Sequence, residues 1–342
     1  MTRAPKRILF QGLGGAGQRH LRIFRELLPQ AEMFAWRRAR KTPVLNADFT
    51  VDQDATLEGR YGIELLGSMQ EAWERNPDLV VIATPSIFHA DAAIKAANHG
   101  ASIFVEKPGA IDRKQYLAVA SALRENGVDY FVSFQRRFHP LVQRMRSIVQ
   151  SGELGPVMSV RVNVASYVPD WHPYEDFRNL YACREDLGGG VLRTESHEID
   201  LVSWLFGAPE RICGLTGRRG PYVIDVEDSA ELLLDYGDFG VQMSLCFMQR
   251  HQERSFTING QDGWLQCDLL RQKLRLGISG TSEVQVFEET MDMESMFRRQ
   301  ADYFLNRFER GDSTYLNAVG NLTQIIDAAS LTGNLFGSDA GK

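Results

Sequence analysis

Three glycines near the start of the chain have the spacing of a phosphate-binding turn. Gly12, Gly14 and Gly17 form a G-x-G-x-x-G pattern between an apolar segment at residues 8–10 and a helical stretch at residues 19–28. There the first glycine permits a tight turn, the second lets the backbone approach a pyrophosphate, and the third lets helix and strand pack closely. The helix N-terminus attracts phosphate. We expect a dinucleotide site on Gly12, Leu13, Gly14, Gly15, Ala16 and Gly17. A glycine-rich turn in an unrelated α/β domain is the alternative.

A lysine follows a second apolar segment. Residues 102–105 are typical of a strand, and the chain continues as Glu106-Lys107-Pro108. Ligands of open α/β sheets bind beyond the carboxyl ends of the strands, so Lys107 is expected to reach a substrate hydroxyl and to stabilise a developing alkoxide. A surface lysine is the alternative. Pro108 restricts the exit of the chain and tolerates a cis bond. Glu106 has two interpretations: a structural pair, or a ligand of the cofactor's ribose.

A histidine in the second half of the chain is suited to proton transfer. Oxidation of a hydroxyl carbon by hydride transfer needs a base, and the ordinary pKa of histidine, near ~6.5, fits that task. His197 follows three glycines, in a stretch predicted to be helical over residues 191–205. On one continuous helix Thr194, His197 and Asp200 share a face, so Asp200 is expected to orient the imidazole. A structural histidine inside the helix is the alternative.

The choice between the two nicotinamide cofactors depends on the residues after the strand predicted at 32–36. An acidic residue about ~20 positions past the glycine turn binds the 2′-hydroxyl of NAD. Here the chain has Arg37, Arg38, Arg40 and Lys41, and no carboxylate occurs between residues 35 and 46. Arginines bind a 2′-phosphate through paired contacts, which favours NADP over NAD. A solvated basic loop is the alternative.

Candidate substrate residues are found on two further segments. The loop near residues 167–176 carries Tyr167, Asp170, Trp171, His172, Tyr174, Glu175 and Asp176. Aromatic faces pack on the C–H surfaces of sugars and carboxylates bind hydroxyls, so we expect Trp171 and Tyr174 to bind substrate. An oligomer interface is the alternative. Arg137 and His139 follow the last strand of the first half, where they line a cleft or, with Pro140, begin a helix.

The elements that position these residues fall into two regions. Before residue 135, strands at 8–10, 32–36, 78–84, 102–105 and 130–133 alternate with helices at 19–28, 89–98 and 116–126. Repeated βα units predict a parallel, doubly wound sheet. Beyond that, alternating segments at 157–167, 230–236, 241–248, 255–258 and 264–269 predict a mostly antiparallel sheet, with helices at 141–150, 191–205, 295–308 and 317–330. We expect a dinucleotide-binding domain at residues 1–135 and a substrate and oligomerisation domain at 136–342.

Composition excludes several classes of protein. The 342 residues carry a net charge of −6, which disfavours a nucleic-acid partner. The 4 cysteines, none in a C-x-x-C motif, argue against a zinc ribbon, and we expect no metal. The same cysteine usage disfavours a disulfide framework and fits a reducing compartment. We see no signal peptide and no membrane span, so we expect a cytoplasmic protein.

Taken together, the motifs resemble the Gfo/Idh/MocA family, the glucose–fructose oxidoreductase and inositol dehydrogenase group. The resemblance covers almost the whole chain and rests on motifs at similar spacing. These are the glycine turn, Ala83-Thr84-Pro85 with His89, Glu106-Lys107-Pro108, Arg137-Phe138-His139-Pro140, and Gly188-Gly189-Gly190 with His197 and Asp200. It implies an N-terminal Rossmann domain plus a C-terminal α+β domain with a large, predominantly antiparallel sheet.

The resemblance also implies an activity and its residues. It implies an NAD(P)-dependent oxidoreductase that acts on a hydroxyl or keto carbon of a sugar, inositol or nucleotide sugar. Lys107 and His197 would handle the proton, and Thr84, Pro85, His89, Glu106 and Lys107 would line the cofactor site. Arg137, Thr194 and the aromatic loop would bind substrate. A similar loop occurs in a subgroup linked to bacterial surface-sugar synthesis. By analogy the protein would be a homodimer or homotetramer.

One departure from the family makes a rival without turnover credible, and a second rival is a different enzyme. Many members carry an aspartate four residues before the histidine, where this chain has Arg193. Counted from the glycines, Thr194 occupies that slot, so the aspartate is missing on either count. Glu195 is a poor substitute, since a helix would direct it away from His197. The rivals are an NADP-binding redox sensor without turnover and a reductase of C=N or C=C bonds.

Overall fold

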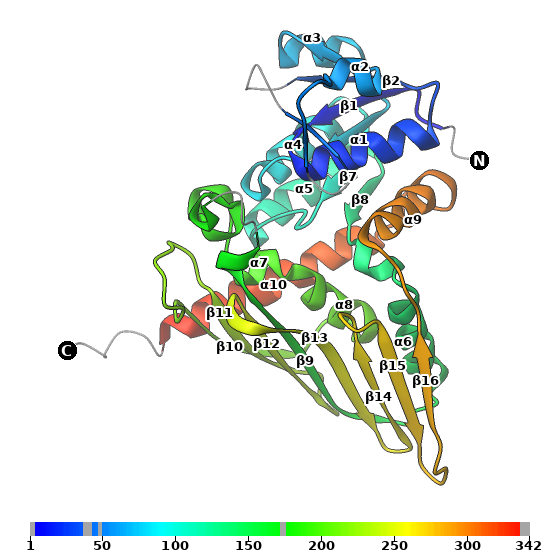
Figure 1. Cartoon of the computed structure of the whole chain (residues 1–342), viewed down its shortest axis with the longest axis vertical. Coiled ribbons are helices and arrows are strands. Elements are labelled where there is room, and N and C mark those ends of the chain that lie inside the picture. The colour runs from blue at the N-terminus through cyan, green and yellow to red at the C-terminus, as the bar shows by residue number, and fades with distance from the viewer. Residues whose placement is uncertain (1–3, 37–42, 47–49, 172–175, 336–342) are drawn as a thin grey trace, which may run out of the picture. The chain divides into compact units, whose positions relative to one another are not determined.

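The chain folds into two compact units. The computed structural model describes residues 4–36, 43–46, 50–171 and 176–335, with the side chains of 332–335 left out. Unit 1 comprises Met1–Gln135 and Asp292–Val319, and unit 2 comprises Arg136–Met291 and Gly320–Lys342 (Figure 1). Each unit is built around its own sheet.

The sheet of unit 1 is parallel throughout, as the sequence predicts. Its order is β5-β2-β1-β6-β7-β8, and each pairing of neighbours is parallel. The strands are β1 (Arg7–Gln11), β2 (Glu32–Trp36), β5 (Glu64–Leu66), β6 (Leu79–Ile82), β7 (Ser102–Glu106) and β8 (Tyr130–Ser133). All residues of β6 and β8 are buried, as expected for strands covered on both faces. A small separate pair is formed by β3 (Val44–Leu45) and β4 (Val51–Asp52).

The helices of unit 1 carry the two motifs at the strand ends. They are α1 (Gly15–Leu27), α2 (Leu57–Tyr61), α3 (Met69–Glu74), α4 (His89–Asn98), α5 (Arg113–Asn126) and α9 (Met293–Asn306), with a short turn η1 (Ser86–Phe88). α1 begins at Gly15, earlier than the predicted residue 19, because extended Gly14 caps it. Asp112 caps α5 by accepting a hydrogen bond from the Gln115 N–H at 2.7 Å.

Helix α9 joins unit 1 although it follows the whole antiparallel sheet in sequence. The Phe297 ring packs edge-to-face on His20, with centroids 5.4 Å apart. Gln300 Nε2 donates to Ser133 Oγ at 2.8 Å. These contacts are why Asp292–Val319 belongs to unit 1, whereas the sequence predicts one uninterrupted second domain over 136–342.

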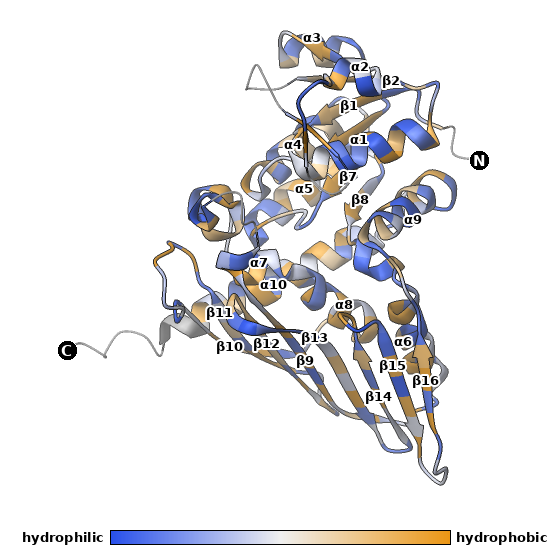
Figure 2. Ribbon diagram, in the orientation of Figure 1, coloured by the Kyte–Doolittle hydropathy of each residue, from blue (hydrophilic) through white to orange (hydrophobic). Residues whose placement is uncertain are grey.

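The sheet of unit 2 is predominantly antiparallel, again as predicted. Its order is β10-β11-β12-β9-β13-β14-β15-β16, and only β9 and β12 pair in parallel. The strands are β9 (Val157–Tyr167), β10 (Arg211–Gly217), β11 (Ser229–Asp235), β12 (Gly240–Cys246), β13 (Met248–Gly260), β14 (Gly263–Asp268), β15 (Lys273–Ile278) and β16 (Val284–Glu288). Figure 2 shows these strands banded with hydrophilic and hydrophobic residues, the pattern of a sheet with one buried face.

Helices cover the buried face of this sheet. α6 (Pro140–Ser151) packs on β14 and β15, and α7 (Val191–Thr194) packs on β11 and β12. A Cβ on Gly214 would lie 2.7 Å from Ala329 Cβ, so β10 approaches α10 (Thr314–Leu335) closely. The remaining elements are α8 (Ser196–Phe206) and the turns η2 (Gln135–Phe138), η3 (Val168–Asp170), η4 (Phe177–Asn179), η5 (Tyr181–Cys183) and η6 (Glu185–Leu187).

The single helix predicted over residues 191–205 is wrong in one respect. Glu195, with φ −89° and ψ 25°, separates α7 from α8. Thr194 and His197 therefore lie on different helices, and the shared face that a continuous helix would give them is lost. Within the part of the chain that is described, no helix is both long and apolar enough to cross a membrane.

Candidate active site

The glycine turn is packed tightly on one side and open on the other. Gly12 has φ +93°, and a Cβ there would lie 2.4 Å from the Ala83 carbonyl oxygen. A Cβ on Gly17 would lie 2.0 Å from the Gly12 carbonyl oxygen. Gly14, in contrast, would place its Cβ in a space with no atom within 4 Å. The turn thus has the three glycine functions predicted from the sequence: tight turn, open approach and close packing.

The surroundings of this turn fit a dinucleotide. α1 begins directly after Gly14 and has no acidic residue in its first turn, so its N–H groups face no competing carboxylate there. Gln11 Nε2 and Thr84 Oγ1 are buried and have no hydrogen-bond partner among the described residues. Thr84 is next to the turn, since a Cβ on Gly12 would lie 2.8 Å from its backbone nitrogen. Polar atoms without partners beside an open helix end are groups that a ligand would satisfy.

Glu106 is engaged inside unit 1. Its Oε1 lies 2.6 Å from His20 Nε2 and accepts a hydrogen bond from Ser133 Oγ at 3.0 Å. Its Oε2 accepts from the Lys107 N–H at 3.2 Å. Burial opposes ionisation, but the hydrogen bond from His20 and the charges of His20 and Lys107 hold the pKa of Glu106 below its ordinary value. Of the two sequence interpretations, these contacts support the structural pair.

Lys107 itself is half-buried and follows β7 directly, with a cis peptide bond to Pro108. The cis bond agrees with the sequence expectation. At the end of another strand of unit 1, Thr84 and Pro85 lead into η1, and His89 begins α4. The His89 ring is buried, with Nδ1 2.7 Å from the Pro108 carbonyl oxygen and Nε2 2.8 Å from that of Thr84. It therefore supports the loops of the expected cofactor site from inside the fold.

His197 is buried on α8, in unit 2. In sequence it lies between Glu195 and Glu198, whose carboxylates share one arginine. Arg254, on β13, lies 2.7 Å from Glu195 Oε2 and 2.6 Å from Glu198 Oε1. Glu195 and Glu198, three residues apart, thus share one guanidinium. The two carboxylates hold the pKa of Arg254 above its ordinary value in spite of burial. Glu195 is thus an ion-pair partner of Arg254.

Two further arginines hold α8. Arg136 Nε lies 3.5 Å from Glu198 Oε1, and burial together with the charge of Arg254 lowers the pKa of Arg136 to about 10. Arg137 donates to Asp200 through Nε at 2.8 Å and Nη2 at 2.6 Å. Since both Asp200 oxygens accept from Arg137, an additional role of Asp200 in orienting His197 stays a prediction. The same pairing leaves Arg137 3% exposed.

The structure describes some of the other predicted site residues and not the rest. Thr194 is buried on α7, and Trp171 packs edge-to-face on Phe247, with centroids 5.0 Å apart. Tyr174 and the arginines at 37 and 38 lie outside the described residues.

Sequence reasoning missed three residues: His20, Arg254 and Glu227. The Glu227 carboxylate accepts a hydrogen bond from the Leu192 N–H at 3.2 Å, beside the glycines that precede His197. Of these three residues, only His20 left a signal in the sequence, because it is a histidine on the side of α1 that is buried.

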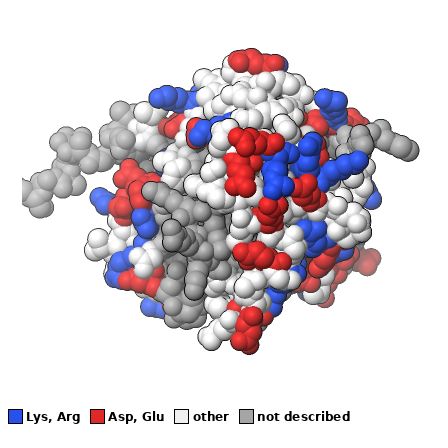
Figure 3. All heavy atoms as spheres, turned by 90° about the horizontal axis from the view of Figure 1, so that it is seen from above, with Lys and Arg blue, Asp and Glu red and all other residues white. Residues whose placement is uncertain are grey.

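Charges of both signs lie on the face of the molecule drawn in Figure 3. On the face drawn in Figure 3, acidic and basic side chains are interspersed, and neither sign forms a continuous field. An extended basic patch is what a nucleic-acid partner requires.

Two family models match the chain over most of its length. Residues 6–134 match the model described as oxidoreductase family, NAD-binding Rossmann fold, and residues 142–266 match the GFO/IDH/MocA C-terminal domain. D-xylose 1-dehydrogenase (NADP(+)) 2 of Haloferax volcanii is 27% identical over 241 residues, which are 69% of this chain and 71% of that relative.

Solved structures agree on the fold. A levoglucosan dehydrogenase in complex with NADH and levoglucosan superposes with a TM-score of 0.81 at 17% identity, covering 96% of this chain and 97% of that one. The WlbA dehydrogenase from Bordetella pertussis, in complex with NADH and UDP-GlcNAcA, gives 0.74 at 23% identity, covering 95% and 96%. The motifs, the two sheets and both family models lead to one conclusion: the chain belongs to the GFO/IDH/MocA family of oxidoreductases.

Proposed function

We propose that this protein transfers a hydride between a nicotinamide cofactor and a hydroxyl or keto carbon of a sugar, inositol or nucleotide sugar. The observation that carries the proposal is the open side of the glycine turn. Gly14 faces empty space at the N-terminus of α1, and Gln11 Nε2 and Thr84 Oγ1 lie buried without partners nearby. Backbone N–H groups of residues 12–17, with Thr84 and Pro85, would hold the cofactor.

Two side chains are proposed to handle the substrate proton. The bound nicotinamide supplies or accepts the hydride. Lys107, directly after β7, donates a hydrogen bond to the reacting oxygen and stabilises negative charge on it. His197, on α8, takes the proton from the hydroxyl in oxidation and returns it in reduction. Thr194 and Trp171 are proposed substrate contacts, whereas the pairing of Arg137 with Asp200 supports a structural role for that arginine.

We further propose a preference for NADP. β2 ends at Trp36, and no carboxylate follows between residues 35 and 46 to bind a ribose 2′-hydroxyl. Arg37 and Arg38 come next in sequence, where arginines bind a 2′-phosphate bidentately. The relative from Haloferax volcanii is named for NADP, whereas the two similar structures contain NADH.

The substrate class rests on the relatives. They are named for D-xylose and levoglucosan, and WlbA was crystallised with a nucleotide sugar. We also propose a role in bacterial surface-sugar synthesis, with which the nucleotide sugar bound to WlbA is compatible. We place the protein in the cytoplasm, in keeping with its cysteine usage.

We also propose a homodimer or homotetramer, paired through the solvent face of the unit 2 sheet. There Leu215 on β10 and Leu233 on β11 are 42% and 59% exposed. A Leu233→Asp variant would then have a smaller molecular mass than wild type, as measured by light scattering. An unchanged mass for that variant would reject this face as the interface.

The first test is cofactor binding, measured by nicotinamide fluorescence during separate titrations with NADPH and NADH. Tight binding of NADPH that an Arg37→Ala/Arg38→Ala variant loses is the expected result. Gly14→Ala adds a methyl group where no atom lies within 4 Å, so it should fold normally and bind either cofactor weakly. Gly240→Ala, whose nearest atom is 4.0 Å away, is the matched control. Binding of NADH alone overturns the NADP preference, and binding of neither cofactor rejects the dehydrogenase.

Turnover separates the activity from its rivals. D-xylose, levoglucosan, scyllo-inositol and UDP-GlcNAcA are assayed with the preferred cofactor. Oxidation of one of them that falls in both Lys107→Met and His197→Ala supports the proposed roles. Cofactor binding without turnover on this panel supports the redox sensor. Activity that survives His197→Ala supports a reductase of C=N or C=C bonds, where no hydroxyl proton is removed.

A further inference from the structure

Lys107 lies between two residues that are each held by a buried histidine. On one side, His20 Nε2 is 2.6 Å from the carboxylate of Glu106. On the other side, His89 Nδ1 is 2.7 Å from the carbonyl oxygen of Pro108. Both histidines are 1% exposed. Their contacts therefore act within the fold rather than on a ligand that arrives from solvent.

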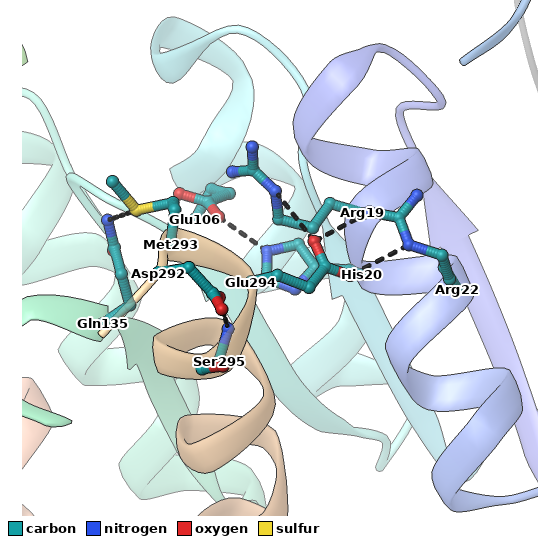
Figure 4. A network of polar contacts seen from close by, with 9 residues as sticks. All are labelled: Arg19, His20, Arg22, Glu106, Gln135, Asp292, Met293, Glu294 and Ser295. Carbon is teal, nitrogen blue, oxygen red and sulfur yellow. Dashed lines mark hydrogen bonds and ion pairs between the residues drawn. The ribbon is translucent and has the colours of Figure 1, made fainter. Parts of the chain in front are cut away.

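The His20 ring contacts the carboxylate of Glu106, the residue before Lys107 (Figure 4). An ionised carboxylate only accepts, so His20 Nε2 carries the hydrogen. His20 Nδ1 is buried and has no hydrogen-bond partner within the described chain. The other Glu106 oxygen accepts from the Lys107 N–H at 3.2 Å. Glu106 thereby links α1 to the backbone of Lys107.

The arrangement around His20 is rigid. Its ring packs edge-to-face on Phe104 and Phe297, with centroids 5.1 Å and 5.4 Å away. Ser133 Oγ donates to the same Glu106 oxygen at 3.0 Å and accepts from Gln300 Nε2 at 2.8 Å. In this series of hydrogen bonds Gln300 donates to Ser133, and both Ser133 and His20 donate to Glu106. The carboxylate therefore has a single arrangement that satisfies every donor.

The His89 contact fixes the other side of Lys107. Its Nε2 lies 2.8 Å from the Thr84 carbonyl oxygen, so one ring bridges Thr84 and Pro108. Thr84 also carries one of the two polar atoms without partners beside the glycine turn. A shift of the Thr84 loop would therefore move Pro108, and with it the chain next to Lys107.

We infer that His20 and His89 are positioning residues for Lys107, which they hold from both sides and tie to the glycine-turn helix and the Thr84 loop. This inference rests on the proposed function only in taking Lys107 as the substrate-binding lysine. Ångström-scale misplacement of a catalytic group lowers turnover by roughly 100-fold, so a device that fixes its backbone matters to rate.

The test reads the Lys107 amine directly and needs no substrate. The wild type and variants are labelled with trace acetic anhydride, and mass spectrometry gives the labelling rate of Lys107 relative to exposed Lys95 and Lys114. His20→Phe keeps a ring for the aromatic contacts and removes the donor. His89→Phe removes both contacts to carbonyl oxygens. We expect the relative rate at Lys107 to rise roughly tenfold in His20→Phe, the equivalent of one lost hydrogen bond to a charged group, and to rise by a smaller factor in His89→Phe, whose partners are neutral carbonyls.

Two variants separate positioning from general loss of structure. His20→Gln keeps an N–H donor at this position, so its Lys107 labelling rate is expected to equal that of wild type. His99→Phe is the matched control, because exposed His99 stacks on Trp73 and contacts only the Lys95 carbonyl through its ring nitrogens. If His20→Phe does not fold, Ser133→Ala removes another donor to the same Glu106 oxygen and should raise the Lys107 rate by a smaller factor.

The outcomes for the inference and for the proposed function differ. Folded His20→Phe and His89→Phe variants that label Lys107 at the wild-type rate would overturn the inference, whatever the enzyme turns over. A wild type that binds no nicotinamide would reject the proposed function and leave the labelling result readable. Once a substrate is found, both variants should lower kcat, and a change in cofactor affinity alone would count against the inference.

Discussion

The two residues proposed to handle the substrate proton are supported by different chemistry. Around Lys107 the supporting groups are imidazoles, His20 and His89, which contact a carboxylate and two backbone carbonyls. We call these the imidazole frame. Around His197 they are guanidinium groups, Arg254, Arg136 and Arg137, which contact Glu195, Glu198 and Asp200. We call these the guanidinium frame.

The comparison teaches how each proposed catalytic group is protected from its surroundings. A guanidinium keeps its charge: even where burial lowers the pKa of Arg136 to about 10, the group stays ionised at neutral pH. An imidazole titrates near neutrality, and burial lowers the pKa of His89 although its two carbonyl contacts oppose the shift. The guanidinium frame is therefore held by ion pairs, whereas the imidazole frame is held by hydrogen bonds, in a setting where burial disfavours the charged form of His89.

Removal of Arg254 should have the largest effect on stability. In Arg254→Met the carboxylates of Glu195 and Glu198 remain buried without that partner, and breaking a buried pair in this way costs about 3–5 kcal/mol. Urea unfolding followed by fluorescence gives the free energy of unfolding. Arg161→Ala, which changes an exposed arginine of the same sheet, is the control and should lie within about 0.5 kcal/mol of wild type.

Neutralising the carboxylates sharpens this prediction. Adding Glu195→Gln and Glu198→Gln to Arg254→Met should recover much of the loss, because the penalty comes from unpaired charge. If the triple variant is as unstable as Arg254→Met alone, packing rather than charge holds α8.

His20→Phe should cost less than Arg254→Met. It removes one hydrogen bond to a charged group, for which about 1.5–3 kcal/mol is expected. The aromatic contacts with Phe104 and Phe297 remain possible. Urea unfolding is again the measurement, and a loss equal to that of Arg254→Met would remove the difference between the two frames.

The imidazole frame should also give the protein a specific dependence on acid. The pKa of Glu106 is lowered in the folded protein, so its ionised form stabilises the fold above the unfolded value of about ~4.3, and this contribution is lost as pH falls through the folded pKa. At pH values below ~4.3, the unfolding free energy of wild type should decrease as pH falls. In Glu106→Gln this dependence on pH should be shallower, by up to roughly 1.4 kcal/mol per pH unit. Glu58→Gln, at an exposed position, is the control, and equal slopes in the two variants would contradict the assignment.

The smallest effect is expected for an arginine pair near the surface of unit 1. Arg22 donates to Glu294 at 2.9 and 2.8 Å, but the two side chains are 18% and 37% exposed. Arg22→Gln should therefore cost less than about 1 kcal/mol. This pair has the chemistry of the guanidinium frame without its burial. A cost comparable to that of Arg254→Met would mean that ion-pair chemistry, and not burial, sets the strength of the guanidinium frame.

Much of the fold and the local motifs could be predicted from the sequence, because they depend on short-range patterns. Strand β8 and helix α4 have the bounds that periodicity gave them, and the functions expected of Gly12, Gly14 and Gly17 agree with the space around each one. A turn of this kind is encoded within a few residues, so neighbours in sequence are enough to find it.

The partners of the site residues could not be predicted. Asp200 was expected to serve His197 three residues away, yet its two oxygens accept from Arg137, 63 positions earlier. Likewise the shared attraction of Glu195 and Glu198 to Arg254 accompanies the break of a helix that looks continuous in sequence. Pairings of this kind are decided by packing across the fold, which periodicity does not record.

The return of α9 to unit 1 has a consequence for the newborn chain on the ribosome. Phe297, which packs on His20, and Gln300, which donates to Ser133, are synthesised only after all eight strands of the other sheet. Residues up to 135 therefore leave the ribosome before the helix that packs on α1, and the surroundings of Lys107 are completed only after α9 is synthesised. A chain cut short before residue 292 would leave Phe104 and Phe131 without the Phe304 ring that packs on them, and apolar surface of this kind is recognised by chaperones and proteases.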